Sequence, residues 1–147
     1  MNKLLKAASL MLQLLCLALS GCTHSDPSAA TPAVHDEPEP IARTEFTDRV
    51  ENFFEYEPLH VGKHSQFRIH LTDLSDGSPV NQAQVSLTVR RRGEDAKVSE
   101  TVAKVGKVTG IYVADLSIPQ AGQYDIEFHI KNAKLDERLA LSDFKVE

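Results

Sequence analysis

From Arg43 onward, the apolar residues of this chain recur at every second position rather than at every third or fourth. Side chains alternate between the two faces of a β-strand, so such a run has one apolar face and one polar face. Strands of this kind bury their apolar faces against each other in a two-layer antiparallel structure. The three clearest runs have as their apolar members Phe67, Ile69 and Leu71; Val85, Leu87 and Val89; and Tyr124, Ile126, Phe128 and Ile130.

Weaker segments and turns complete this pattern. No segment has a clear helical period, and short strands spaced by about 8–12 residues are typical of a small β-sandwich. The sequence therefore predicts an all-β fold, an Ig-like antiparallel β-sandwich of about seven strands, over residues 43–147. The weaker strands are expected at 44–50, 52–57, 96–102, 111–117 and 139–146, and the turns at 61–63, 75–79, 92–95, 105–107 and 119–122.

The turn before the last clear run predicts a structural role for two residues. Tyr124 opens a late strand just after a turn, which is the setting of a tyrosine corner, in which the hydroxyl bonds an upstream backbone group. Gly122 would allow the close approach that this arrangement needs. The alternative is an ordinary half-buried strand tyrosine.

The first 21 residues predict an export signal. A basic start, Met1–Lys6, precedes an apolar run over 7–19 that is too short to span a membrane as a helix. The segment Leu19-Ser20-Gly21-Cys22 resembles the lipobox of bacterial lipoproteins, in which the cysteine sulfur is acylated and the chain is cut before it. The resemblance implies lipidation of Cys22 and a membrane partner. The alternative is a secreted protein whose Cys22 is incidental.

Residues 22–42 are expected to form a tether. The segment contains four of the seven prolines of the chain and few apolar residues, so it should stay extended and solvated. Thr23 follows the cysteine where the lipoprotein family uses aspartate for retention at the inner membrane. The resemblance therefore implies the periplasmic face of the outer membrane.

Composition excludes several classes of function. Removal of residues 1–21 takes away two lysines and no acid, so the net charge changes from −5 to −7. An acidic chain does not bind nucleic acid non-specifically, since such binding depends on Lys and Arg. The only other cysteine, Cys16, lies in the removable segment, so the mature chain has no disulfide within it. Nucleophile and phosphate-binding motifs are missing from the sequence, so neither enzyme activity nor a cofactor is expected.

Histidines and one acidic loop are the remaining candidates for chemistry. His60 and His64 flank a turn and are weak candidates for a metal site, although surface histidines are the commoner reading. His70 and His129 should lie outward on strands of opposite sheets. The loop Asp73-Leu74-Ser75-Asp76-Gly77 has a spacing that does not fit a calcium-binding EF-hand, and its acids are expected to cap their own turn.

The run FFEYEPLHVGKHSQFRIHLTDLSDGSPV, residues 53–80, is similar to the N-terminal Ig-like region of periplasmic adaptor subunits of resistance-nodulation-division (RND) efflux pumps, the heavy-metal group in particular. The segment Ala121-Gly122-Gln123-Tyr124-Asp125-Ile126-Glu127-Phe128 continues the match. The resemblance implies contacts with an efflux adaptor or an outer-membrane channel.

Adaptors of this family continue into a helical hairpin, a lipoyl-like domain and β-barrel domains. This sequence ends at Glu147, just after the predicted sandwich, so we expect an accessory role rather than that of a complete adaptor. Two alternatives stay open: a periplasmic metal-binding lipoprotein that uses the loop histidines, and a structural envelope lipoprotein.

Overall fold

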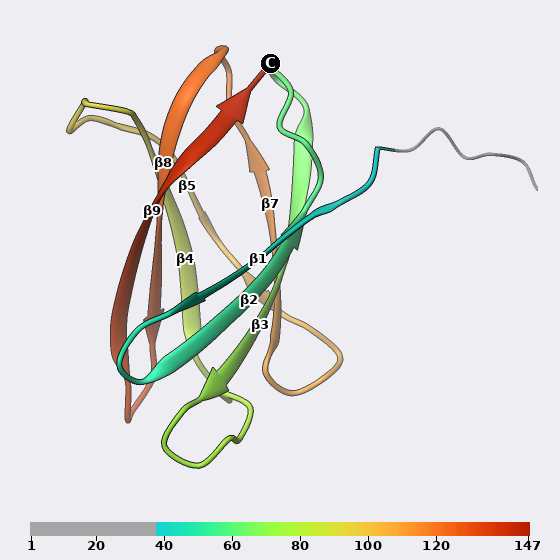
Figure 1. The fold of residues 1–147 in the computed structure, drawn as a ribbon. Coiled ribbons are helices and arrows are strands. Elements are labelled where there is room, and N and C mark those ends of the chain that lie inside the picture. The colour runs from blue at the N-terminus through green and yellow to red at the C-terminus, as the bar shows by residue number, and fades with distance from the viewer. Residues whose placement is uncertain (1–37) are drawn as a thin grey trace, which may run out of the picture. The chain divides into compact units, whose positions relative to one another are not determined.

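A computed structural model describes residues 38–147, which form two antiparallel β-sheets and contain no helix (Figure 1). These described residues therefore include no helix that could span a membrane. The predicted signal peptide, the lipidation site Cys22 and most of the predicted tether lie outside the described residues. The strands are β1 (Ile41–Phe46), β2 (Val50–Tyr56), β3 (His64–Asp73), β4 (Gln84–Arg91), β5 (Lys97–Val102), β6 (Lys104–Val105), β7 (Ile111–Ser117), β8 (Gly122–Lys131) and β9 (Asp136–Val146).

The strands form where the sequence alternates. Inward residues of β3, β4 and β8 are buried and most of their neighbours are exposed or half-buried, which confirms the three clearest runs. Phe67, Leu87, Tyr124 and Phe128 are at most 1% exposed. The period-two pattern therefore located the core correctly, because each strand buries one face against the other sheet.

The order of the strands is that of an Ig-like sandwich. One sheet has the order β1-β2-β3-β7-β6 and the other β5-β4-β8-β9. Apart from the added edge strand β1, these are the orders A-B-E-D and C′-C-F-G of the immunoglobulin fold. The predicted fold class is thus confirmed, and β8, which carries Tyr124, occupies the place of strand F.

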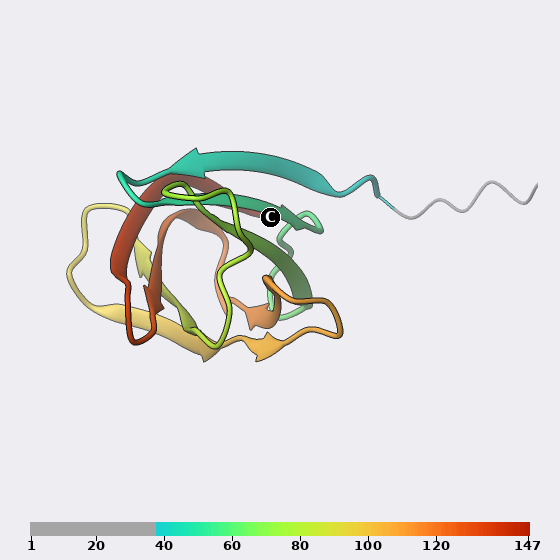
Figure 2. The same cartoon turned by 90° about the horizontal axis from the view of Figure 1, so that it is seen from below.

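The chain changes sheet at Ala103. β5 pairs with β4 and β6 pairs with β7, and only this one residue separates the two strands. The amide of Ala103 donates a hydrogen bond to the carbonyl of Val85 at 2.8 Å. The run β5–β6 therefore connects the two sheets along one side of the sandwich, and in Figure 2 it lies opposite β1.

Five aromatic rings form the centre of the core between the sheets. Phe54 packs on Phe128 with ring centroids 4.9 Å apart, and Tyr56 stacks on Phe67 at 4.8 Å. Phe144 from β9 contacts this group from the second sheet. Rings at these separations attract one another beyond the burial of their area, so the cluster holds the two sheets together.

Two expectations about the first strands need correction. The predicted strand over 44–50 is wrong, because β1 ends at Phe46 and a turn follows. The hydroxyl of Thr47 accepts hydrogen bonds from the amides of Arg49 and Val50, at 3.2 and 3.0 Å, and this reverses the chain. In addition β1 begins at Ile41, two residues before the expected start of the domain.

The structure has nine strands where about seven were expected. The three clear and five weaker segments account for eight of these strands, and the ninth is the two-residue strand β6, which overlaps a segment expected to be a turn. This difference arises at a sheet edge, where strands are exposed and their apolar pattern is weak.

Candidate interaction surface

Each sheet ends in two edge strands, which leave backbone donors and acceptors without a partner strand on one side. The edges are β1 and β6 in the five-stranded sheet and β5 and β9 in the four-stranded sheet. Because β5 runs into β6 through Ala103, the sandwich has two open sides: one between β1 and β9, and one along β5–β6.

The side between β1 and β9 is bridged. Arg43 donates from Nη1 to the carbonyl of Ser142 at 3.1 Å, and its guanidinium lies 5.0 Å from the centroid of Phe144. Further along, the amide of Glu147 donates to the carbonyl of Leu59 at 3.1 Å, and the amide of Val61 donates to the carbonyl of Glu147 at 2.9 Å. These contacts occupy the end of β9 that another strand would need.

The side along β5–β6 carries exposed valines instead. Eight large apolar side chains are exposed in the described part of the chain, and four of them fall between residues 98 and 108. The exposed fraction is 38% for Val98, 54% for Val102, 65% for Val105 and 61% for Val108. We call these four residues, with the backbone of β5 and β6, the valine edge. Grouped apolar exposure of this kind marks interaction sites on soluble domains.

The charges near the valine edge are mostly positive. Lys97 forms an ion pair with Glu100, and hydrogen bonding from Lys97 lowers the pKa of the Glu100 carboxyl. None of the ion pairs found between residues 38 and 147 involves Lys104 or Lys107. The edge is therefore locally basic on a chain whose net charge is −5.

Sequence reasoning missed this surface. The four valines are spaced by four, three and three residues, so they do not follow the period of a buried strand face. Their exposure depends on which strands pair with β5 and β6, and those partners lie elsewhere in the sequence. The signal that was present is a group of four valines within eleven residues whose spacing is not that of one buried strand face.

The four histidines of the domain do not form one cluster. His60 lies in the β2–β3 loop and His64 opens β3, and both are exposed. His70 on β3 packs edge-on against Phe53, at 5.3 Å between centroids, while His129 on β8 contacts Asp136 at 2.6 Å. As expected, these last two belong to opposite sheets. Among residues 38–147 no group of three or more His, Cys, Asp or Glu side chains has the arrangement of a metal site.

The structure gives Tyr124 the contact expected of a tyrosine corner. Its hydroxyl donates to the carbonyl of Gln120, four residues upstream, at 2.8 Å. Gly122 has a φ of 150°, and a Cβ there would lie 3.2 Å from the guanidinium of Arg91. The turn before β8 therefore packs against Arg91 of β4 on one side and against the Tyr124 ring on the other.

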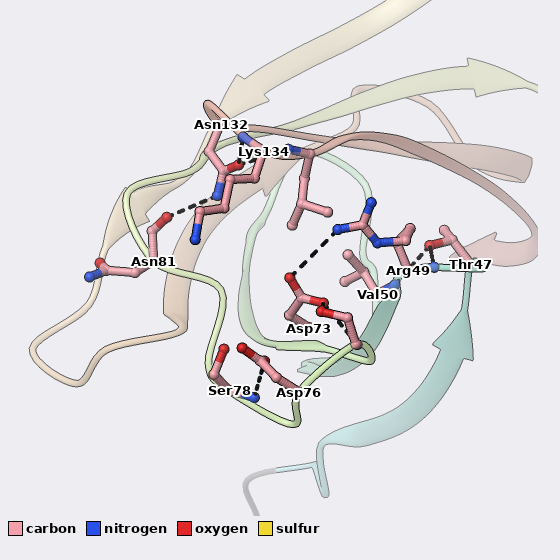
Figure 3. A network of polar contacts seen from close by, with 11 residues as sticks. Thr47, Arg49, Val50, Asp73, Asp76, Ser78, Asn81, Asn132 and Lys134 are labelled. Atoms are coloured by element: carbon pink, nitrogen blue, oxygen red, sulfur yellow. Dashed lines mark hydrogen bonds and ion pairs between the residues drawn. The ribbon is translucent and has the colours of Figure 1, made fainter.

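Polar side chains close the end of the sandwich formed by the β3–β4 and β8–β9 loops (Figure 3). Asp73 Oδ1 accepts hydrogen bonds from the amide and hydroxyl of Ser75, at 2.9 and 2.6 Å, and Asp76 Oδ1 accepts one from the amide of Ser78 at 2.9 Å. Hydrogen bonds from these serines lower the pKa of both carboxyls. The acids therefore cap their own turn, as the sequence predicted, rather than converging on a cation.

Replacing Asp73 by asparagine should make stability less sensitive to acid. The folded-state pKa of Asp73 lies below its unfolded value, so its contribution is present above the unfolded pKa and is lost as pH falls through the folded pKa. The parent chain should lose unfolding free energy between about pH 5 and pH 2, and Asp73→Asn should lose less. Urea unfolding at a series of pH values measures this, and equal slopes for both chains would contradict it.

One family model matches most of the sandwich. The family model described as YtkA-like, an Ig-like β-sandwich domain type of periplasmic proteins, matches residues 45–129, from β1 to β8. No curated protein matches the chain. Among solved structures, the chain is similar to one titled "ZirS C-terminal Domain", with 14% identity, a TM-score of 0.42, and coverage of 97% of this chain and 87% of that one.

The YtkA-like match spans more than half of the chain and most of the sandwich, including the valine edge. The family match agrees with the strand order and the Tyr124 contact described above. The chain belongs to the YtkA-like family.

Proposed function

We propose that this protein is an exported, lipid-anchored accessory module that binds another envelope protein, and that its partner is an adaptor or outer-membrane channel of an RND-type efflux system. The observation that carries the binding role is the valine edge, since apolar exposure on an unpaired strand is a feature that soluble domains otherwise avoid. The efflux partner is supported by the resemblance of residues 53–80 to the Ig-like region of adaptor subunits.

The predicted anchor gives this binding a physical advantage. Two or three acyl chains on Cys22 would hold the module at the membrane essentially irreversibly, because each buried methylene contributes about 0.8 kcal/mol. The tether would then confine the sandwich near other envelope proteins and raise its effective concentration toward them. A weak contact through one strand edge would be sufficient under these conditions.

A site-specific crosslink in living cells tests the partner. A photo-crosslinking amino acid replaces Val102 in the valine edge. In a control it replaces Thr44, which is exposed on β1, an edge strand of the other sheet. We expect a crosslink to an efflux adaptor or channel subunit from position 102 and none from position 44. Equal crosslinking from both positions, or none to such a subunit from position 102, would overturn the proposed partner.

The anchoring is tested in the same cells by fractionation. The parent chain should sediment with the membranes, and Cys22→Ser should move to the soluble fraction. A parent chain that is already soluble would show that Cys22 carries no lipid.

A further inference from the structure

The run β5–β6 has hydrogen-bonding capacity that the described chain does not use. β5 pairs only with β4, and β6 pairs only with β7, so the opposite side of each strand faces no other strand of the described residues. The backbone N–H and C=O groups on that side of β5 and β6 have no partner strand among the described residues. Such an edge is a template on which an extended segment adds as a further strand.

The side chains on this run favour an apolar strand. In β5 the inward residues are Ser99 and Thr101, opposite Val89 and Leu87, so Val98, Glu100 and Val102 point outward. An added strand would place its alternate side chains beside these three, at the distance at which cross-strand pairs interact. β-branched residues at those positions would cover Val98 and Val102 and remove them from water.

The usual protection of a free edge is weak along β5. Natural edges are guarded by charges, above all lysine, that disfavour a new strand. Lys97 at the start of β5 is neutralised by its ion pair with Glu100. The start of β9 shows the contrast, with the three successive charged residues Asp136, Glu137 and Arg138.

Two lysines without ion-pair partners in the described part of the chain indicate the charge of the partner segment. Lys104 and Lys107, at the far end of the run, have no acidic partner within residues 38–147. Lys104 lies in β6 and Lys107 two residues after its end, so a strand added along β5–β6 would pass beside the first and end near the second. Carboxylates at that end of the strand would pair with them, whereas lysines would be repelled.

We infer that the valine edge accepts an extended segment of a partner protein, rich in β-branched residues and carrying acidic residues, as an additional β-strand. This inference rests on the proposed function, because it specifies how the module contacts its partner. Backbone hydrogen bonds would fix the register of the added strand, and Val98 and Val102 would form its apolar contact. Lys104 and Lys107 would favour acidic residues in the partner segment.

Hydrogen exchange on the full chain tests the inference with two synthetic peptides. One alternates valine with glutamate, and the other has lysine in place of each glutamate. At millimolar concentration, the glutamate peptide should slow exchange of amides in 97–105 by about tenfold, and the lysine peptide should not. Exchange in β1 and β9 serves as the internal control.

Two variants make the test specific. Lys104→Glu combined with Lys107→Glu should reverse the preference, so that the lysine peptide protects 97–105 and the glutamate peptide does not. Val102→Thr preserves β-branching but replaces a methyl with a hydroxyl, and it should reduce protection by the glutamate peptide.

The outcomes separate this inference from the proposed function. Absence of protection in 97–105, or an unchanged preference in the double variant, overturns strand addition even if Val102 crosslinks to an efflux subunit in cells. Protection with charge reversal, without any such crosslink, supports strand addition and overturns the efflux partner instead.

Discussion

Replacement of Phe54 by alanine is expected to lower the free energy of unfolding by about 3–5 kcal/mol. Phe54 is fully buried, and its ring lies within 6.4 Å of four other aromatic rings, measured between centroids. The substitution leaves a cavity between the two sheets, and those rings relax into it only in part. Urea unfolding of the parent and variant chains measures the difference.

Phe53 provides the matched control, because it precedes Phe54 on β2 and points outward. It is half-buried and contacts His70 on the outer face of the sheet. Phe53→Ala should therefore cost about 1 kcal/mol or less, since little cavity can form at a surface. Similar losses for the two variants would contradict the assignment of inward and outward faces on β2.

Tyr112→Phe should destabilise the fold by about 2–4 kcal/mol, although it removes a single oxygen atom. The Tyr112 hydroxyl donates to the carbonyl of Val80 at 2.9 Å and accepts from the amide of Ala83 at 3.0 Å. All three residues are buried, so phenylalanine would leave two backbone groups without a partner and out of reach of water. The loss can be measured by thermal or urea unfolding.

Tyr124→Phe is the control for this effect. The Tyr124 hydroxyl also donates to a backbone carbonyl, that of Gln120. This carbonyl lies in an exposed turn, so water can take the place of the hydroxyl as its hydrogen-bond donor. The expected loss is about 0.5–1.5 kcal/mol. A larger loss for Tyr124→Phe than for Tyr112→Phe would show that the tyrosine corner, and not the Tyr112 bridge, holds the loops in place.

The sequence was sufficient to predict the sandwich because its central strands are buried on one face only. Phe67, Leu87 and Phe128 alternate with polar neighbours, so their direction could be inferred without knowing their partners. The turn at Thr47 could not be inferred in this way, since it contains neither glycine nor proline. It depends on one side-chain oxygen that bonds two amides.

Residues whose environment depends on distant partners were beyond the sequence analysis. Asn52 lies inward on β2, between Val50 and Phe54, and is fully buried, although its type suggests exposure. The valine edge is the opposite case, since Val102 and Val105 are apolar but exposed on edge strands. The histidines were identified as candidates by residue type; strand pairing separates His70 from His129, whereas His60 and His64 stay on either side of one turn.

The positions of the tyrosines determine how this protein can be followed in solution. The chain contains three tyrosines and no tryptophan, and Tyr56, Tyr112 and Tyr124 are 6%, 1% and 1% exposed. Near-ultraviolet absorption and emission therefore arise from phenol rings that all leave the interior together when the domain opens. The protein carries its own optical reporter of unfolding, free of energy transfer to indole, and two such rings remain in each of the tyrosine variants.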